Sequence, residues 1–320
     1  MGSTWRHDGT RPALRNVLAA LAAVLIVIGG PEASARAAAP QHKTFKSPEA
    51  AVKALIEAAG AQDVKALVAL FGPGSEDLVS SGDDAADARD RSLLVKAYGE
   101  AHRLERPGYG RRILYIGKDD WPMPVPIVKT GKRWRFQTDE GRQEILSRRV
   151  GENELGAIQT CLAIVDAQKE YAVLDRDTDK LLEYAEKFES DEGKRDGLYW
   201  ETAPGEPLSP MGPLVARATA EGYKNPEQMS PYHGYYFKIL TGQGENAGGG
   251  AYSYIVNGNM IGGFAVVAWP ALYRSSGVKS FIVNHEGVVY EKDLGAETAK
   301  LAAAMTVFDP DKTWKKVEAK

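Results

Sequence analysis

The sequence predicts an α+β protein of two domains that follow a targeting segment. The chain of 320 residues is longer than one typical domain of about 100–150 residues. In each half, helical periodicity comes first and short strand-like segments follow, which is the order of α+β folds. The hydrophobic content of 43% and the charged content of 26% are those of an ordinary soluble globular protein.

Residues 1–37 have the pattern of a cleaved signal peptide. Arginines precede the apolar run Val17–Gly30, and Ala35-Arg36-Ala37 then fits the small-residue cleavage pattern. A membrane span needs about 20 apolar residues, and this run has 14. We therefore expect a periplasmic or secreted protein that keeps no stable membrane span after cleavage.

The single cysteine and the net charge exclude several classes of protein. Cys161 can form neither an intramolecular disulfide nor a multi-cysteine metal site. No cysteine stands directly after the apolar run, where a lipid would be attached to a new N-terminus. Without residues 1–37 the chain has 36 Lys and Arg against 41 Asp and Glu, a formal charge of −5. On this count we expect neither nucleic acid nor anionic lipid as a partner.

The predicted first domain, residues 43–150, opens with helices. Ser47-Pro48 is an N-cap followed by proline at the first helical position, and this helix is expected to end at Gly60. A second helix is expected over Val64–Phe71, before a Gly-Pro-Gly sequence. The acidic stretch 80–92 is interpreted as a polar connector, after which helical periodicity resumes.

Three strand-like segments complete the first domain, at residues 111–117, 124–131 and 132–139. A hairpin turn is expected at Thr130-Gly131-Lys132, and the alternating prolines of residues 121–126 suit an edge strand. Helices followed by a curved antiparallel sheet resemble the cystatin-like cone fold of nuclear-transport-factor-2-type domains.

The predicted second domain, residues 151–320, opens with one helix over Asn153–Asp175. Two apolar stripes, one with Leu162 and one with Cys161, predict that this helix is largely buried. A polar segment follows, and then an antiparallel sheet and a terminal helix over Glu297–Phe308. The strands are expected at residues 234–242, 250–258, 262–273, 278–284 and 288–295.

The turn between the last two strands contains a histidine and a carboxylate. The sequence Asn284-His285-Glu286-Gly287 is typical of a type I turn, with Asn first and a glycine free to take a positive φ. In this interpretation His285 and Glu286 both lie at the exposed tip. Replacement of His285 by alanine is then expected to be nearly silent, whereas Gly287→Val should destabilise the hairpin.

Several sequences in combination resemble a family of exported bacterial proteins described as domain of unknown function 2950. They include "DDWPMPVP", "GKRDGLYW", "PYHGYYFKILTGQG" and "SGVKSFIVNHEGVVYEKDLG". This resemblance covers roughly residues 43–316 and implies no activity. The C-terminal half also resembles the globular domains of pilins and pseudopilins, which place one long helix on an antiparallel sheet. Because the N-terminus has the pattern of an ordinary secretion signal, polymerisation through a pilin helix is not expected.

One acidic segment matches part of a calcium-binding loop. Asp175, Asp177 and Asp179 stand at positions 1, 3 and 5 of the EF-hand pattern, with Glu186 at position 12. Alternating carboxylates can converge on Ca²⁺, which takes about 6–8 oxygen ligands. Position 6 is Lys180 where the pattern requires glycine. The alternative is that these acids are solvated, with Asp179 as the N-cap of a helix over residues 181–188.

The remaining candidates favour structural roles. Cys161 lies among apolar residues without a neighbouring histidine, so it is interpreted as a small buried hydrophobe. His233 stands at the entry of a strand, and the mature-chain histidines form no metal-binding pair. Tyr199 and Trp200 are either a ligand-binding lip or packed on their own domain. The glycine-rich stretch 242–251 lacks phosphate-loop spacing. No catalytic residue is therefore predicted.

We expect a non-enzymatic binding or interaction module, with calcium as its one candidate cofactor. The expected partner is an envelope protein or a small ligand. The alternative is a small-ligand carrier or an enzyme that uses the concave interior of the first domain.

Overall fold

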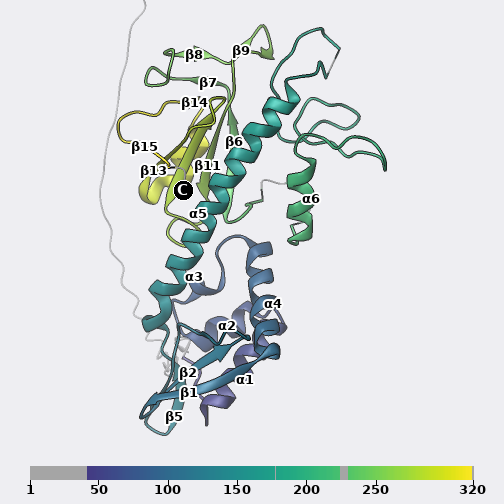
Figure 1. The fold of residues 1–320 in the computed structure, drawn as a ribbon. Helices are drawn as coiled ribbons and strands as arrows, with labels where there is room; N and C mark the ends of the chain where they lie inside the picture. The colour runs from purple at the N-terminus through teal and green to yellow at the C-terminus, as the bar shows by residue number, and fades with distance from the viewer. Residues whose placement is uncertain (1–41, 177, 224–229, 319–320) are drawn as a thin grey trace, which may run out of the picture. The chain divides into compact units, whose positions relative to one another are not determined.

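The computed structural model describes residues 42–176, 178–223 and 230–318, and the predicted signal peptide lies outside them. Residues 40–320 form one compact unit. Its hydrophobic residues gather in two cores, one built from residues 45–145 and the other from residues 157–317. Helices and antiparallel sheets make up both, so the predicted α+β class is confirmed (Figure 1). No helix in the described parts is long and apolar enough to cross a membrane.

The N-terminal core packs helices on one antiparallel sheet. The strand order is β1-β2-β4-β5, with the short β3 paired to β2. The helices are α1 (Pro48–Gly60), α2 (Val64–Phe71), α3 (Glu76–Val79) and α4 (Asp84–Glu100). The strands are β1 (His102–Gly108), β2 (Arg111–Ile116), β3 (Trp121–Pro122), β4 (Ile127–Thr130) and β5 (Arg133–Phe136). The predicted cap at Ser47 is confirmed, since its hydroxyl accepts a hydrogen bond from Ala50 N.

The interpretation of residues 80–92 as a connector is wrong. Helix α4 begins at Asp84, and the Asp83 carboxylate caps it by accepting a hydrogen bond from Ala86 N at 3.0 Å. The helix could not be predicted from the spacing of apolar residues, because α4 has no strong apolar stripe. Its N-cap Asp83 and, within the helix, Asp87 are buried.

Helix α5 (Thr138–Tyr171) is much longer than predicted at its N-terminal end and runs through the boundary expected at residue 150. Its polar first half explains the omission, since apolar residues recur only later. Ala157, Cys161, Ile164 and Tyr171 are buried as expected, whereas Leu162 is 40% exposed. The helix therefore begins beside the N-terminal core and ends against the second core (Figure 1).

The C-terminal core is a five-stranded antiparallel sheet in the order β15-β13-β12-β11-β6, and α5 packs on it. Its strands are β6 (Tyr235–Leu240), β11 (Ala265–Pro270), β12 (Lys279–Asn284), β13 (Val289–Asp293) and β15 (Lys315–Lys316). All six residues of β11 are buried, which fits a strand with neighbours on both sides and packed faces.

Short elements surround this sheet. The small sheet β14-β7-β8 and the hairpin β9–β10 replace the single strand expected at residues 250–258. They are β7 (Gly242–Gln243), β8 (Tyr252–Ser253), β9 (Ile255–Val256), β10 (Asn259–Met260) and β14 (Val307–Phe308). The remaining helices are α6 (Gly212–Ala220), the 3₁₀ turn η1 (Gly295–Glu297) and α7 (Thr298–Ala304). The predicted terminal helix thus ends early, because residues 307 and 308 pair with β7 in parallel.

The turn between β12 and β13 is confirmed, but the position of its histidine is not. Gly287 has a φ of +76°, and its N–H donates to Asn284 O at 2.8 Å. His285 is half-buried and packs against the rings of Tyr254 and Phe264 at centroid distances of 5.9 and 6.4 Å. The exposed residue of this turn is Glu286. The expectation of a silent His285→Ala therefore rested on a wrong placement.

Candidate functional site

The acidic segment that suggested calcium forms a tight loop. Its first carboxylate, Asp175, accepts hydrogen bonds from Thr178 N at 2.7 Å and Lys180 N at 2.9 Å. Both donors have a positive φ, of +69° and +73°. Asp179 accepts from Leu181 N and from Asn259 Nδ2, which ties the loop to the β9–β10 hairpin.

Residues 181–188 contain no helix, so Asp179 is not the helix N-cap that the alternative interpretation required. Ala185 is held in an extended segment by two hydrogen bonds with Gln168, and the neighbouring Glu186 is exposed. Asp177 lies outside the described residues. Among the residues that are described, no group of three or more His, Cys, Asp or Glu is placed to hold a metal ion. The calcium site thus stays a prediction.

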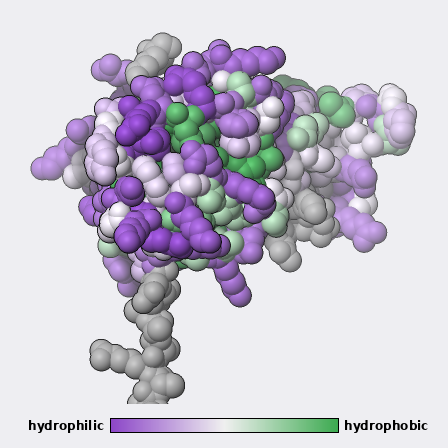
Figure 2. Space-filling view, turned by 90° about the horizontal axis from the view of Figure 1, so that it is seen from below, coloured by the Kyte–Doolittle hydropathy of each residue, from purple (hydrophilic) through white to green (hydrophobic). Residues whose placement is uncertain are grey.

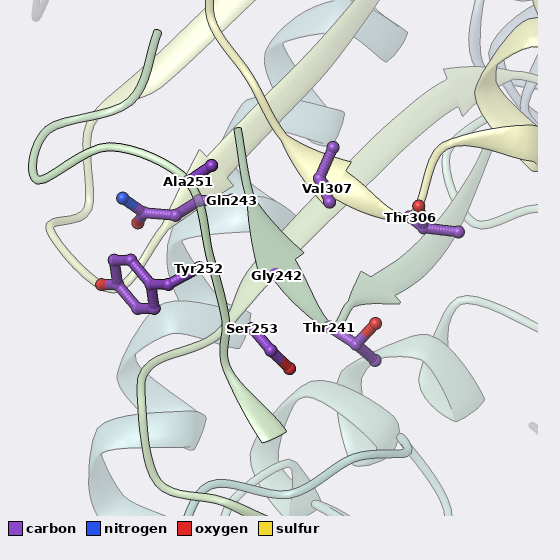
Figure 3. Close-up of a pocket in the computed structure, with 8 residues that line it drawn as sticks. All are labelled: Thr241, Gly242, Gln243, Ala251, Tyr252, Ser253, Thr306 and Val307. Carbon is purple, nitrogen blue, oxygen red and sulfur yellow. The ribbon is translucent and has the colours of Figure 1, made fainter. Parts of the chain in front are cut away.

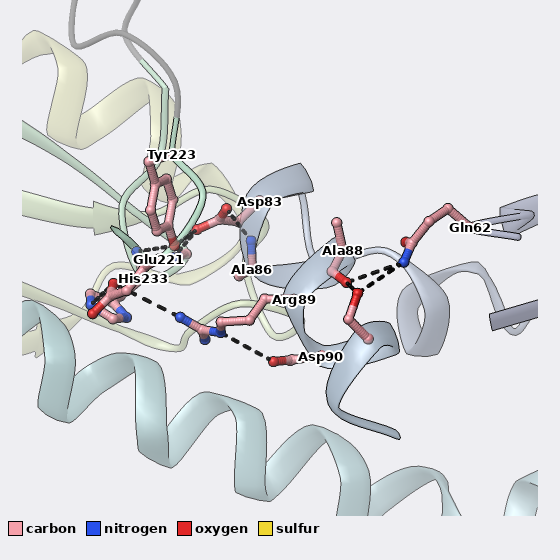
Figure 4. Close-up of polar contacts among 11 residues, drawn as sticks. Gln62, Asp83, Ala86, Ala88, Arg89, Asp90, Glu221, Tyr223 and His233 are labelled. Carbon is pink, nitrogen blue, oxygen red and sulfur yellow. Dashed lines mark hydrogen bonds and ion pairs between the residues drawn. The ribbon is translucent and has the colours of Figure 1, made fainter. Parts of the chain in front are cut away.

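Five residues from three segments of the chain form a polar junction between the two cores: Asp83, Arg89, Glu221, Tyr223 and His233. Asp83 is 1% exposed, and its Oδ2 accepts hydrogen bonds from the Tyr223 hydroxyl and from Gly234 N, each at 2.8 Å. The N-cap of α4 is therefore also the attachment point of the strand entry before β6 (Figure 4). Burial, followed by the negative charge of Asp83, raises the pKa of Tyr223.

Within the junction, His233 contacts both Tyr223 and Glu221. It has a φ of +50°, its N–H donates to the Tyr223 hydroxyl, and its Nε2 lies 3.3 Å from Glu221 Oε2. Arg89 Nη1 approaches the same carboxylate oxygen at 3.9 Å (Figure 4). Burial lowers the pKa of His233 more than the Glu221 carboxylate raises it. The imidazole is therefore held neutral at pH 7.

The junction has the side chains of an acid–base site but the bonding of a structural one. Both oxygens of Asp83 are engaged by donors of the protein itself, two of them backbone N–H groups. A carboxylate bound in this way positions the chain and has little capacity left for a substrate. The arrangement fastens residues 221–223 and 233–234 to α4.

The other residues that the sequence offered for a functional role are packed against the rest of the protein. Cys161 is fully buried, and burial raises the pKa of its thiol to about 12, which makes it unreactive. The guanidinium groups of Arg176 and Arg195 lie 5.4 and 5.5 Å from the centre of the Trp200 ring. Tyr199 exchanges backbone hydrogen bonds with the segment of residues 188–190. These contacts favour the packed interpretation over a ligand-binding lip.

A shallow pocket of about 380 Å³ lies over the small sheet β14-β7-β8. Gly242 forms its floor, with Tyr252 on one side and Val307 on the other (Figure 3). A Cβ at Gly242 would lie 3.0 Å from Tyr252 O and 3.4 Å from Val307 Cγ1, so a side chain here would crowd both neighbouring strands. The lining residues are Thr241, Gly242, Gln243, Ala251, Tyr252, Ser253, Thr306 and Val307.

The pocket combines one aromatic ring with hydroxyl groups and no charged residue. Tyr252 is 41% exposed, and the ring of Tyr254 supports it edge-on at 5.6 Å. Gln243 is buried and holds the glycine-rich loop through Gly248 O and Gly250 O, at 2.6 and 2.7 Å. Such a surface can stack on an apolar ring face and exchange hydrogen bonds with neutral polar groups.

The sequence interpretation missed both arrangements. Asp83 had a usable signal, since an N-cap residue stands before the alanine-rich stretch that opens α4. The pocket had none, because its lining residues come from three short segments that only the sheet pairing brings together.

A family model described as "Protein of unknown function (DUF2950)" matches residues 42–317. Comparisons with the curated proteins and with the solved structures returned no match.

Proposed function

Because the chain belongs to this family of proteins of unknown function, we propose a function from geometry: it is a non-enzymatic binding module, exported to the periplasm or secreted. The pocket over the β14-β7-β8 sheet carries this proposal. It is the described hollow where an exposed aromatic ring and several hydroxyl-bearing side chains meet, and no titratable acid or base stands among its lining residues except Tyr252.

The lining favours a neutral, hydroxyl-rich ligand such as an oligosaccharide. The face of a sugar ring is apolar and can stack on Tyr252, while its hydroxyls can exchange hydrogen bonds with Thr241, Ser253 and Thr306. The volume of about 380 Å³ accommodates one or two such rings. A charged ligand would find no counter-charge among these residues.

Saturation-transfer NMR against neutral oligosaccharides and short uncharged peptides tests the pocket. We expect transfer from the protein to at least one oligosaccharide and its loss in Tyr252→Ala. Tyr109→Ala is the matched control, since Tyr109 is 89% exposed and lies far along the chain in the β1–β2 turn. Binding that survives Tyr252→Ala, or that fails equally in both variants, would contradict the proposal.

The proposal of an exported protein has its own test. Residues 1–37 supply the supporting pattern, and N-terminal sequencing of the protein from fractionated cells should find the new terminus after Ala37. Recovery of uncleaved chain in the cytoplasmic fraction would overturn it.

Calcium binding is proposed as a secondary property of the Asp175 loop. Asn259 Nδ2 donates a hydrogen bond to Asp179, so an ion bound by the loop would also stabilise the β9–β10 hairpin. A thermal melt in calcium against chelator should show a shift that Asp177→Ala abolishes. Equal melting temperatures in both conditions would remove this proposal without affecting the pocket.

A further inference from the structure

The sheet of the N-terminal core has a positive charge that the whole chain lacks. Residues 102–135 contain nine Lys and Arg and three Asp and Glu, whereas the chain has a formal net charge of −3. Electrostatic attraction to a surface depends on charges within a Debye length, about 8–10 Å, and not on the net charge of a distant core. The expectation that anionic lipid is no partner rested on the net charge of the whole chain. It did not consider the local charge of this sheet.

Strand register brings six of these cations to one end of the sheet. Arg111 pairs with Val128, and Lys129 N donates to Gly110 O at 2.7 Å. The β1–β2 turn and the β4–β5 turn therefore lie side by side. We call this the basic hairpin end, and its cations are Arg106, Arg111, Lys129, Lys132, Arg133 and Arg135.

The positive charge of the basic hairpin end is only partly neutralised. Arg111 is paired with Glu140 at 2.7 Å. Arg133 donates to the backbone oxygen of Thr44 at 2.8 Å, which leaves its charge in place. Lys129 and Lys132 are exposed. Burial and, after it, the Arg135 guanidinium lower the pKa of His42, while the Asp139 carboxylate raises it.

An exposed tyrosine stands at the same end. Tyr109, in the β1–β2 turn, is 89% exposed. A tyrosine among cations is typical of proteins that bind the headgroup layer of a bilayer, where the ring is half in water and half in lipid. The molecular face seen from below is mostly hydrophilic, with apolar residues gathered in one area (Figure 2).

The chain also enters the fold at this charged end. His42, the first described residue, lies 3.4 Å from Arg135, so the polypeptide enters the fold at the basic hairpin end. We infer that the basic hairpin end docks the protein on a membrane surface rich in anionic phospholipid.

Vesicle sedimentation of the chain without residues 1–37 tests this inference, since residues 40–320 are a compact unit by themselves. We expect binding to vesicles of phosphatidylglycerol and phosphatidylcholine, no binding to phosphatidylcholine alone, and loss of binding as salt is raised. Each cation near an anionic bilayer contributes about fivefold in affinity, so K129Q/K132Q should weaken binding roughly 25-fold. Tyr109→Ser should weaken it further.

K315Q/K316Q is the matched control, because it makes the same change in net charge on exposed residues of β15 in the other core. This control variant should bind vesicles like the unmodified chain. Equal losses in the two double variants, or equal binding to neutral vesicles, would overturn the inference. Retention on immobilised polyphosphate or heparin without any vesicle binding would also overturn it, since the partner would then be an anionic polymer. Circular dichroism of each variant confirms that the fold is kept.

Discussion

Asp83 shows how one buried carboxylate serves two distant segments. Its Oδ1 caps α4 through Ala86 N, and its Oδ2 faces two donors, the Tyr223 hydroxyl and Gly234 N. The hydroxyl can rotate to donate elsewhere, but the backbone N–H cannot. Any substitution that removes the Oδ2 acceptor therefore leaves a buried donor without its bond.

We expect Asp83→Asn to lower the free energy of unfolding by about 2–4 kcal/mol, because an amide NH₂ would oppose Gly234 N. Urea unfolding followed by circular dichroism measures this. Asp84→Asn makes the same charge change at the exposed next residue and should cost at most about 1 kcal/mol. Similar losses in both variants would mean that Asp83 acts through its charge and not through its bonds.

His285 is the second residue whose surroundings set its importance. Its ring packs on Tyr254 and Phe264, and Nδ1 is buried without a hydrogen bond to any described residue. We expect His285→Ala to cost about 1–2 kcal/mol in a thermal or urea melt, through lost aromatic contact. Glu286→Ala, one residue later and exposed, should stay within about 0.5 kcal/mol. A silent His285→Ala would return the residue to the exposed tip that the sequence suggested.

At the scale of elements, two glycines of α5 provide a matched pair. A Cβ at Gly151 would meet nothing within 4 Å, whereas a Cβ at Gly141 would lie 2.7 Å from the backbone of Pro124. Alanine favours a helix over glycine by about 1 kcal/mol. We expect Gly151→Ala to raise the melting temperature and Gly141→Ala to lower it. If both raised it, α5 would not approach the segment before β4 as closely as described.

These elements also show which parts of the fold the sequence predicts. Helix α1 was predictable because Ser47-Pro48 is a local signal, and the strands of the C-terminal sheet because dense apolar runs lie between glycines and polar turns. Helix α4 and the first half of α5 were not, since both are polar on most of their surface and gain stability from tertiary contacts. The small sheet was missed because its strands are two residues long.

At the scale of the molecule, α5 and the polar junction connect the two cores. Arg149 of α5 donates to Asp77 O and Leu78 O at 2.6 and 2.7 Å and also reaches Ser275 Oγ, which adds a second link. None of these partners could be predicted, because each bond joins residues more than 70 positions apart. Local sequence signals predict caps and turns, and they carry no information on such pairings.

The titration of His233 should report on this connection between the cores. Burial and the cations Arg89 and Arg217 lower its pKa in the folded protein, and they outweigh the carboxylates of Glu221 and Asp83. The unfolded chain, with an ordinary histidine pKa of about 6.5, therefore binds a proton at a higher pH than the folded protein does. The free energy of unfolding must then be highest above pH 6.5 and fall as the pH is lowered through about 6.5 toward the folded pKa.

We expect His233→Gln to remove part of that fall, by up to about 1.4 kcal/mol for each pH unit between the two pKa values. His42 adds to the fall in the unmodified chain, since burial lowers its pKa as well. His102→Gln is the control, because His102 is exposed and stacks on Tyr98. Urea unfolding at pH 7.5, 6.5 and about 5.5 compares the three proteins. If His233→Gln kept the full pH dependence, the imidazole would be solvated in solution and the junction between the cores would be open there.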